Sequence, residues 1–328
     1  MVVVFLEVYL FVLLMYGMYR KKMNAICRSK KRLEGKTCLV TGGTSGLGLE
    51  IAIDFAQRGA RVIIACPFNE EGKNAEKIII QESGNSSVVF KLLDLGSFKS
   101  VRQFAVDIIN TEARLDILMN NAGVGIPRKE TEDGINIIMQ VNYLGHFLLT
   151  ILLMPLLMKS GKPLDPSRIV NTSSVLHRTA MLDVKKLTVL RDNFFKKIIV
   201  YCNSKLCLVL FSRELMKKLA TSNVVINNVD PGEVGTRIFL SAGYIMGYIL
   251  YAMCWFLVKS PFEGAQTPIH AALDEKAGQM SGLFYRDCSP CQPSKAALDD
   301  ELGKRLWDES IKLVGLKDEE VRDLLRQK

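Results

Sequence analysis

The chain has 328 residues, of which 48% are hydrophobic and 23% charged, and its formal net charge is +9 at pH 7. Seven basic residues and no acidic ones fall within residues 20–32, so this one segment accounts for +7 of the excess. The basic charge is therefore local, which favours anionic lipid headgroups over nucleic acid as its partner. The eight cysteines show no disulfide framework and indicate a reducing compartment.

The first segment predicts a transmembrane signal anchor over residues 1–22. Residues 2–19 are apolar except for Glu7, and they are long enough to span a bilayer core of roughly 30 Å at about 1.5 Å per residue. Charges follow the apolar stretch and no small-residue cleavage site appears, which argues against a cleaved signal peptide. The positive-inside rule places the remainder in the cytosol, after a basic juxtamembrane linker over residues 23–36. Glu7 is costly in lipid unless it reaches the interface.

A glycine-rich turn follows the first predicted strand. Residues 37–40 form an apolar run, T-G-G-T-S-G-L-G occupies residues 41–48, and residues 49–57 are amphipathic, which predicts strand, turn and helix before another strand over residues 61–65. The glycines let the backbone approach a pyrophosphate, which the free N–H groups at the start of the helix would bind. A tight turn without a ligand is the alternative interpretation.

Alternating strands and helices continue towards the end of the chain without a linker. Further strands are predicted over residues 117–119, 168–171, 224–229 and 282–286, and several are the continuous apolar runs typical of a parallel sheet covered on both faces. No repeat or low-complexity segment interrupts them. The predicted fold class is α/β, a doubly wound parallel sheet of the Rossmann type in one catalytic domain over residues 37–328.

A tyrosine and a lysine are spaced four residues apart in Y-C-N-S-K. On a helix, Tyr201 and Lys205 lie one turn apart on the same face. A cation beside the phenol favours the phenolate and brings its pKa from about 10 towards the operating pH, where it can exchange a proton during hydride transfer. The pair alone is a weak signal, because such spacings arise by chance on many helices.

Five motifs in this order resemble the short-chain dehydrogenase/reductase family. The glycine-rich turn is similar to the family's cofactor turn, N-N-A-G at residues 120–123 to the motif after its fourth strand, and P-G-x-x-x-T at residues 231–236 to the segment that holds the nicotinamide carboxamide. Two sequence segments are most similar to the membrane-bound retinol dehydrogenase branch and its X-linked dehydrogenase/reductase relative. They are V-N-Y-L-G-H-F-L-L-T and K-R-L-W-D-E-S.

The resemblance implies a catalytic tetrad. Tyr201 would exchange the proton, Ser174 in I-V-N-T-S-S would donate a hydrogen bond to the carbonyl oxygen, and Lys205 would hold the nicotinamide ribose and keep the tyrosine acidic. Asn142 in V-N-Y-L-G-H-F would anchor a water that passes protons through the lysine. The cofactor-binding residues that it implies are Thr41, Gly42, Gly46, Leu47, Gly48, Asp94, Asn121, Ala122, Gly123, Tyr201, Lys205, Pro231, Gly232 and Thr236.

The implied cofactor is NADP or NAD, and the resemblance favours NADP. The second strand, however, ends in A-C-P-F at residues 65–68, which offers neither an acid for the ribose hydroxyls nor an arginine for a 2′-phosphate. The related retinol dehydrogenases usually carry arginine where this chain has Pro67. Lys73 could reach a phosphate, and a solvated helix residue is the alternative interpretation for it.

A second apolar run covers residues 238–258, 21 positions without a charge. Length alone would make it a transmembrane helix. The strand predicted over residues 282–286 has to return to the same sheet, so we interpret the run as an apolar lid or membrane-dipping segment through which a lipid-soluble substrate enters. Ordinary buried core and a true span are the alternatives.

Together these features predict a membrane-anchored oxidoreductase acting on a lipophilic alcohol or carbonyl of the retinoid, prenol or steroid class. The predicted partners are this substrate and membrane lipids, with no nucleic acid and no metal, and a homo-oligomer is compatible with the sequence. The predicted location is the endoplasmic reticulum membrane, with the catalytic domain facing the cytosol. A cofactor-binding or lipid-associated scaffold without turnover is the alternative. His146 and His177, near two tetrad residues, are predicted to be structural.

Overall fold

The computed structural model describes residues 15, 24–125, 130–189, 194–219, 222–234 and 259–326. The predicted anchor over residues 1–22, except residue 15, lies outside the described residues. So do Thr236 and the apolar run over residues 238–258.

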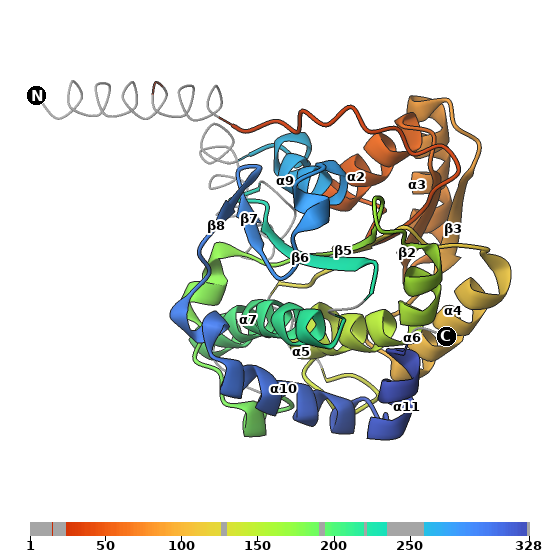
Figure 1. Ribbon diagram of the computed structural model, residues 1–328. Helices are drawn as coiled ribbons and strands as arrows, with labels where there is room; N and C mark the ends of the chain where they lie inside the picture. The colour runs from red at the N-terminus through yellow and green to blue at the C-terminus, as the bar shows by residue number, and fades with distance from the viewer. Residues whose placement is uncertain are drawn as a thin grey trace, which may run out of the picture.

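In the described part of the chain, seven parallel strands and one antiparallel strand form a single sheet (Figure 1). The order across the sheet is β3-β2-β1-β4-β5-β6-β7-β8, with β8 antiparallel at one edge. The strands are β1 (Thr37–Thr41), β2 (Arg61–Cys66), β3 (Val88–Leu92), β4 (Ile117–Asn120), β5 (Ser167–Thr172), β6 (Val224–Asp230), β7 (Phe284–Arg286) and β8 (Ser289–Cys291). The predicted doubly wound parallel sheet is confirmed. Sequence analysis did not predict β3, because this partly exposed strand lacks a continuous apolar run.

Helices cover both faces of the sheet (Figure 1). One face carries α2 (Gly46–Gln57), α3 (Asn69–Ser83) and α9 (Pro261–Leu273), and the other carries α4 (Phe98–Thr111), α5 (Ile137–Met139), α6 (Gly145–Ser160) and α7 (Phe194–Lys218). The C-terminal helices α10 (Asp300–Leu313) and α11 (Asp318–Leu324) pack outside α7 and α6. A π-helical turn (Gln140–Leu144) joins α5 to α6, and short 3₁₀ turns are Val175–Thr179, Val184–Lys186, Ala277–Gln279 and Lys295–Leu298.

Side chains alternate between the two cores along the strands, as the period of a β-strand requires. In β1, Leu39 packs into the core beneath α4, α6 and α7. Its neighbours Cys38 and Val40 pack into the core beneath α2 and α9. All three are fully buried, which accounts for the apolar run that predicted this strand.

One helix in the described residues, Ile137–Ser160, is long and apolar enough to cross a membrane. Most of its side chains are buried inside the protein, so it is the central helix of one core. Phe147 lies 5.0 Å from Phe211 and 5.4 Å from Trp307, measured between ring centres. Trp307 lies on α10, so this C-terminal helix packs on the same core.

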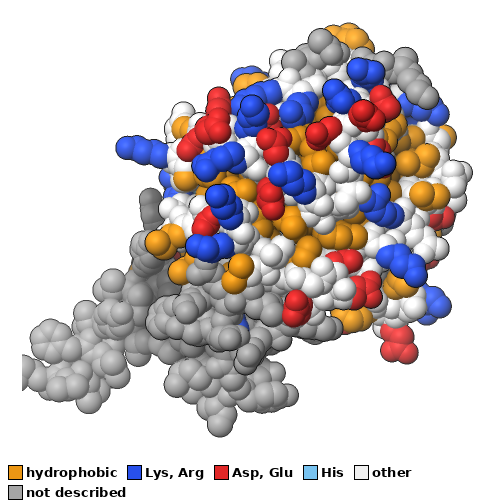
Figure 2. Space-filling view, turned by 90° about the horizontal axis from the view of Figure 1, so that it is seen from below, with side chains coloured by type: hydrophobic (Ala, Val, Ile, Leu, Met, Phe, Trp, Pro, Cys, Tyr) orange, Lys and Arg blue, Asp and Glu red, His pale blue; other side chains and the backbone are white. Residues whose placement is uncertain are grey.

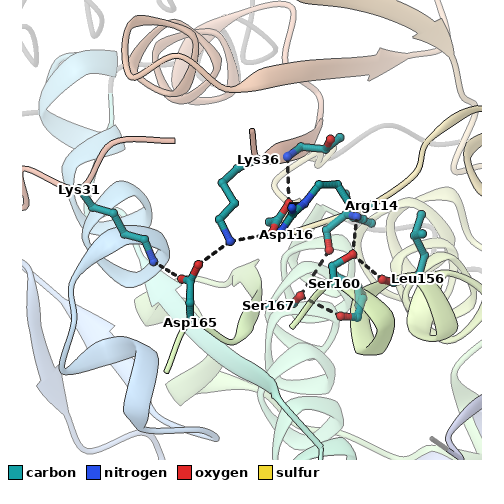
Figure 3. Close-up of polar contacts among 11 residues, drawn as sticks. Lys31, Lys36, Arg114, Asp116, Leu156, Ser160, Asp165 and Ser167 are labelled. Atoms are coloured by element: carbon teal, nitrogen blue, oxygen red, sulfur yellow. Dashed lines mark hydrogen bonds and ion pairs between the residues drawn. The ribbon is translucent and has the colours of Figure 1, made fainter. Parts of the chain in front are cut away.

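The basic segment before β1 packs on the domain from Cys27 onward, and we call residues 27–36 the strap. Figure 3 shows two of its lysines beside carboxylates at the amino ends of β4 and β5. Lys31 pairs with Asp165 at 2.6 Å, and Lys36 pairs with both Asp165 and Asp116. Part of the basic charge that sequence analysis assigned to lipid headgroups therefore neutralises carboxylates of the domain.

The face that α10 and α11 present shows no continuous basic patch in its described residues (Figure 2). Lysine and arginine side chains alternate there with aspartate and glutamate, as the sequences of α10 and α11 require. Mixed charge of this kind is an ordinary solvated surface.

Candidate active site

The sheet order reverses between β1 and β4, and the turns that follow these two strands meet. A Cβ atom added to Gly42 would lie 2.9 Å from the Cα atom of Ala122, and Gly42 has a positive φ of 65°. Only glycine fits such a close backbone approach. Ligands of doubly wound sheets bind at this reversal point, outside the carboxyl ends of the strands. The turns over residues 42–45 and 121–123 therefore mark the candidate site.

The hydroxyl of Thr41 joins these two turns. Its Oγ1 accepts hydrogen bonds from the backbone N–H of Asn121 at 2.9 Å and of Ala122 at 3.1 Å, and lies 2.9 Å from Nε2 of His146. His146 is fully buried, which lowers its pKa to about 3 and keeps it neutral. Its Nδ1 lies 3.3 Å from the Asn142 carbonyl oxygen, which can only accept, so Nδ1 carries the proton. The one hydroxyl proton of Thr41 then has two acceptors, Nε2 of His146 and the Met119 carbonyl oxygen at 3.2 Å. This predicted cofactor residue and the predicted structural histidine hold the turns together.

The N-terminus of α2 fits a phosphate group. The Ser45 side chain at the N-cap makes no capping hydrogen bond, so the first backbone N–H groups of α2 are left for another acceptor. Gly46 has a φ of 54°, and a Cβ atom on Gly48 would lie 2.1 Å from the carbonyl oxygen of Gly42. The side chain of Leu47 packs towards α9, so its contribution to this site is its backbone amide.

Three predicted residues meet beside β5 and α7. Tyr201 and Lys205 lie one turn apart on α7, and the ammonium of Lys205 is 5.5 Å from the centre of the Tyr201 ring. Ser174, directly after β5, forms a side-chain hydrogen bond with Tyr201 and accepts from the N–H of Leu176 at 3.2 Å. Lys205 donates to the carbonyl oxygen of Thr172 at 2.9 Å. A hydroxyl, a phenol and an ammonium group are thereby held within one small region.

Asn142 lies in the π-helical turn between α5 and α6, and its side chain is fully used. Oδ1 accepts from the N–H of Val124 at 2.8 Å, and Nδ2 donates to the Val124 carbonyl at 3.1 Å and to Ser204 at 3.2 Å. A Cβ atom on Gly123 would lie 3.5 Å from Asn142 Oδ1 and 3.6 Å from the Lys205 ammonium. A side chain at residue 123 would therefore be in van der Waals contact with both groups, so the loop after β4 lies directly beside the lysine.

Burial sets the protonation states of the tyrosine and the lysine. It raises the pKa of Tyr201 to about 12, with contributions from Cys202 and Asp230 that the hydrogen bond with Ser174 partly offsets. Burial alone lowers the pKa of Lys205 to about 8. Burial is therefore the largest influence on the pKa of Tyr201 in the protein without cofactor, and the expectation that Lys205 makes the tyrosine more acidic stays a prediction.

The remaining predicted cofactor residues lie at the ends of neighbouring strands. Pro231 and Gly232 follow β6, where the Gly232 N–H donates to Asp230 Oδ1 at 3.0 Å and φ is 84°. Asp94 follows β3, and its carboxylate accepts from the Gly96 N–H at 2.7 Å. Pro67 and Lys73 are both exposed near the start of α3.

Sequence analysis missed an acid near the end of β2. Glu71 in the first turn of α3 is close enough for its charge to raise the pKa of Cys66, which ends that strand. Sequence analysis considered only residues 65–68 at the end of this strand, and Glu71 lies three residues further along the chain. A carboxylate there disfavours a 2′-phosphate on a bound nucleotide.

Sequence analysis also missed a series of hydrogen bonds between buried polar side chains, which we call the polar ladder. It stabilises the elements that carry the site. Asn120 Nδ2 donates to Thr150 at 2.9 Å and to Asn171 Oδ1 at 2.8 Å, and Asn171 Nδ2 donates to Ser212 at 2.8 Å. Ser212 in turn is 2.9 Å from Asn228 Oδ1. The ladder ties β4, β5 and β6 to α6 and α7, so the strand ends and the helix that carries Tyr201 keep one relative position.

Comparison with known proteins assigns the chain to a family. A family model for short chain dehydrogenase matches residues 36–186. Retinol dehydrogenase 13 of Homo sapiens is 40% identical over 302 residues, which cover 90% of each chain. The chain belongs to the short-chain dehydrogenase/reductase family. Dehydrogenase/reductase SDR family member 13 of Bos taurus is also 40% identical, over 293 residues that cover 88% of this chain and 76% of that protein.

Solved structures agree with this assignment. A protein from Mycobacterium paratuberculosis superposes with a TM-score of 0.68 over 87% of this chain and 96% of its own, at 28% identity. The Pseudomonas aeruginosa RhlG/NADP active-site complex superposes with a TM-score of 0.61 over 77% of this chain and 94% of its own, also at 28% identity. As a short-chain dehydrogenase/reductase, this chain is an oxidoreductase that binds NAD or NADP, and the predicted enzyme class and cofactor class are confirmed.

Replacement of Lys205 by methionine should show how much the burial of its charge costs in folding free energy. At pH 7 the depressed pKa corresponds to a burial cost of about 3 kcal/mol for the ammonium. Loss of the donor to Thr172 offsets about 1–3 kcal/mol of this. We therefore expect Lys205→Met to unfold at an equal or higher urea concentration than the parent at pH 7.

The pH dependence gives the sign of the effect. Between pH 8 and 10.5 the unfolded parent keeps its lysine proton while the folded parent loses it, so stability of the parent rises with pH relative to Lys205→Met. Equilibrium urea unfolding in detergent at pH 7, 9 and 10.5 measures this, with the exposed Lys73→Met as the matched control. A difference between parent and variant that does not change with pH would contradict the burial argument.

Proposed function

We propose that the protein is a membrane-anchored enzyme that interconverts a lipophilic alcohol and its aldehyde or ketone, with Tyr201 as the group that gives and takes the proton. The proposal is carried by the meeting of Tyr201, Ser174 and Lys205 beside the loop at Gly123. These residues lie at the carboxyl edge of the sheet, as do the uncapped N-terminus of α2 and the turns over residues 42–45 and 121–123.

A bound nicotinamide dinucleotide would supply a hydride to a carbonyl carbon or accept one from an alcohol carbon. In reduction, the substrate oxygen gains negative charge and takes the proton of Tyr201 Oη while the Ser174 hydroxyl donates a hydrogen bond to it. The high pKa of Tyr201 keeps this proton in place at neutral pH until the much more basic alkoxide forms. The Lys205 ammonium, 5.5 Å from the ring centre, stabilises the phenolate that remains.

The other predicted residues hold the site rather than react. The cofactor phosphates would lie against the backbone amides of residues 46–48, and the ring and ribose would lie near Gly123, Lys205 and Gly232. Asn142 is a positioning residue, because both of its side-chain polar atoms bind Val124 and Ser204 and so fix the loop over Lys205. Thr41 has the same kind of role, because its hydroxyl is occupied within the protein.

The relatives and the composition support a lipid-soluble substrate and a membrane location. Several similar proteins are named retinol dehydrogenases, at 38–41% identity. The chain itself carries two uncharged or nearly uncharged runs, over residues 2–19 and 238–258, that suit lipid. We place the enzyme at the endoplasmic reticulum with its catalytic domain in the cytosol.

The role of Tyr201 can be tested by Tyr201→Phe, which removes the proton donor and keeps the ring. Turnover of retinal, of a polyprenal or of a ketosteroid should fall by at least about 10²-fold, the usual scale for general acid–base catalysis. The Kd for the cofactor and the far-ultraviolet circular dichroism should not change. Tyr143→Phe is the matched control, because it removes another buried phenol hydroxyl, bound to Ser310, outside the site. Unchanged turnover in Tyr201→Phe would sink the mechanism.

Cofactor preference should respond to the end of β2. Pro67→Arg supplies a cation for a 2′-phosphate and should shift the ratio of kcat/KM values towards NADPH by about 1–3 kcal/mol. Glu71→Gln removes a repulsive charge and should shift the ratio in the same direction by less. Leu164→Arg adds the same charge at a distant exposed turn and serves as the control. A parent that already prefers NADPH a thousandfold would show that another cation, Lys73 first, holds the phosphate.

Membrane topology can be tested on microsomes that contain the full chain. If residues 2–19 are the one span, protease added outside should digest the catalytic domain, and alkaline carbonate should not extract the protein. An acceptor site for N-glycosylation placed after Val258 should stay unmodified. Its modification would show that residues 238–258 span the bilayer, and protection of the whole domain would reverse the orientation.

A further inference from the structure

The described residues that border the two apolar runs lie around the first half of α9. They are residues 24–27, residue 234 and residue 259. The backbone N–H of Cys27, three residues after Asn24, donates to Gln266 Oε1 at 3.1 Å. Val234 and Lys259, on either side of the apolar run, form a parallel bridge in which the Lys259 N–H donates to the Glu233 carbonyl at 2.7 Å. A Cβ atom on Gly264 would lie 2.6 Å from Cγ2 of Val234, so this bridge lies against α9. The described residues that follow the first apolar run and those that flank the second therefore lie at one place.

The strap brings the N-terminal run to this place. β1 starts at the amino edge of the sheet, and Lys31 and Lys36 hold the strap there on Asp165 and Asp116 (Figure 3). From that edge the strap runs back along α9, whose last residue, Leu273, accepts from the Ser29 hydroxyl at 3.0 Å. Cys27 lies beside Gln266, nearer the start of α9. Because α9 begins after the β6 end that carries Pro231 and Gly232, the chain leaves the domain towards the carboxyl edge of the sheet (Figure 1).

The surface at this place is apolar and basic. Ile26 is 47% exposed and Phe262 is 54% exposed. Gln266 connects them, because its Oε1 accepts from Cys27 and its Nε2 donates to the Phe262 carbonyl at 3.1 Å. Arg28, next to Cys27 on the strap, is exposed and has no ion pair with any described residue, whereas Lys31 and Arg32 are paired with Asp165 and Glu34.

We propose that Ile26, Phe262 and Arg28 form a lipid-facing surface that rests on an anionic bilayer and turns the sheet edge bearing Tyr201 towards the membrane. Apolar side chains beside a free cation suit the boundary between headgroups and acyl chains. The apolar runs of the sequence come before Asn24 and between Val234 and Lys259, which agrees with lipid as the occupant. A strap that stopped at the amino edge would instead place the site on the side away from the bilayer. This inference rests on the membrane attachment proposed above.

Tryptophan fluorescence in reconstituted vesicles tests the orientation. The full-length protein is placed in vesicles of phosphatidylcholine and phosphatidylserine that contain brominated acyl chains, which quench tryptophan at short range. Phe262→Trp is compared with Leu164→Trp, which adds the same probe at a fully exposed turn by the amino edge. The signal of the two native tryptophans is subtracted with the parent protein. We expect the added fluorescence at 262 to fall at least twofold and that at 164 to be unchanged.

Two outcomes would overturn the proposed orientation. Only the second would also overturn the proposed membrane attachment. Protein that floats with the vesicles while position 262 is quenched no more than position 164 overturns the orientation and leaves the attachment standing. Protein that does not float with the vesicles overturns both. The charge is tested by Arg28→Glu in the Phe262→Trp background, which should reduce the quenching at least twofold with phosphatidylserine present. The ion-paired Arg32→Glu is the matched control, and equal effects of the two variants would remove the Arg28 cation from the surface.

Discussion

The close contact between the turn after β1 and the turn after β4 is the constraint on which the candidate site depends. Gly42 meets Ala122 at a distance that no side chain would permit, and the Thr41 hydroxyl satisfies two backbone N–H groups of the facing turn. The neutral His146 and the Met119 carbonyl both lie within hydrogen-bond distance of that hydroxyl, and the other nitrogen of His146 is bound to the Asn142 carbonyl. One buried chain of hydrogen bonds therefore sets the position of the glycine-rich turn relative to the π-helical turn that carries Asn142.

Burial then decides the electrostatics of the site. Lys205 is charged in an almost dry environment with one carbonyl partner, and Tyr201 keeps its proton to high pH. Both groups are less stable there in their charged forms than they would be in water. A site of this kind is held together by its surroundings, and the polar ladder from Asn120 to Asn228 supplies that support by tying three strands to two helices.

The strap has a different relation to the fold. Its lysines neutralise Asp116 and Asp165 at the amino edge, and its first residues follow α9 towards the opposite edge. Sequence analysis predicted a basic juxtamembrane linker here. In the structure this segment packs on the domain from Cys27 onward. Charge pairing and backbone hydrogen bonds determine the path of the strap, from the amino edge of the sheet to Gln266 on α9.

Local features of the chain were predictable because their physical causes act over a few residues. The apolar runs of β1, β2 and β4 to β7, the helix after Gly46 and the four-residue spacing of Tyr201 and Lys205 all follow from strand and helix periodicity. β3 was not predictable in this way, because a half-exposed strand carries little periodic signal. The acid at Glu71 was missed because it reaches the end of β2 from the next helix, so the letters that end the strand do not include it.

The sequence by itself determined the fold class, the family and the residues that meet at the carboxyl edge, because motif order and hydrophobic period are local properties. Only the tertiary structure decided the protonation of Tyr201, the tautomer of His146 and the path of the strap. Each of these depends on groups separated by tens to hundreds of residues, such as Cys27 with Gln266 or Thr41 with His146. Their desolvation and pairing exist only after the sheet and its helices have packed.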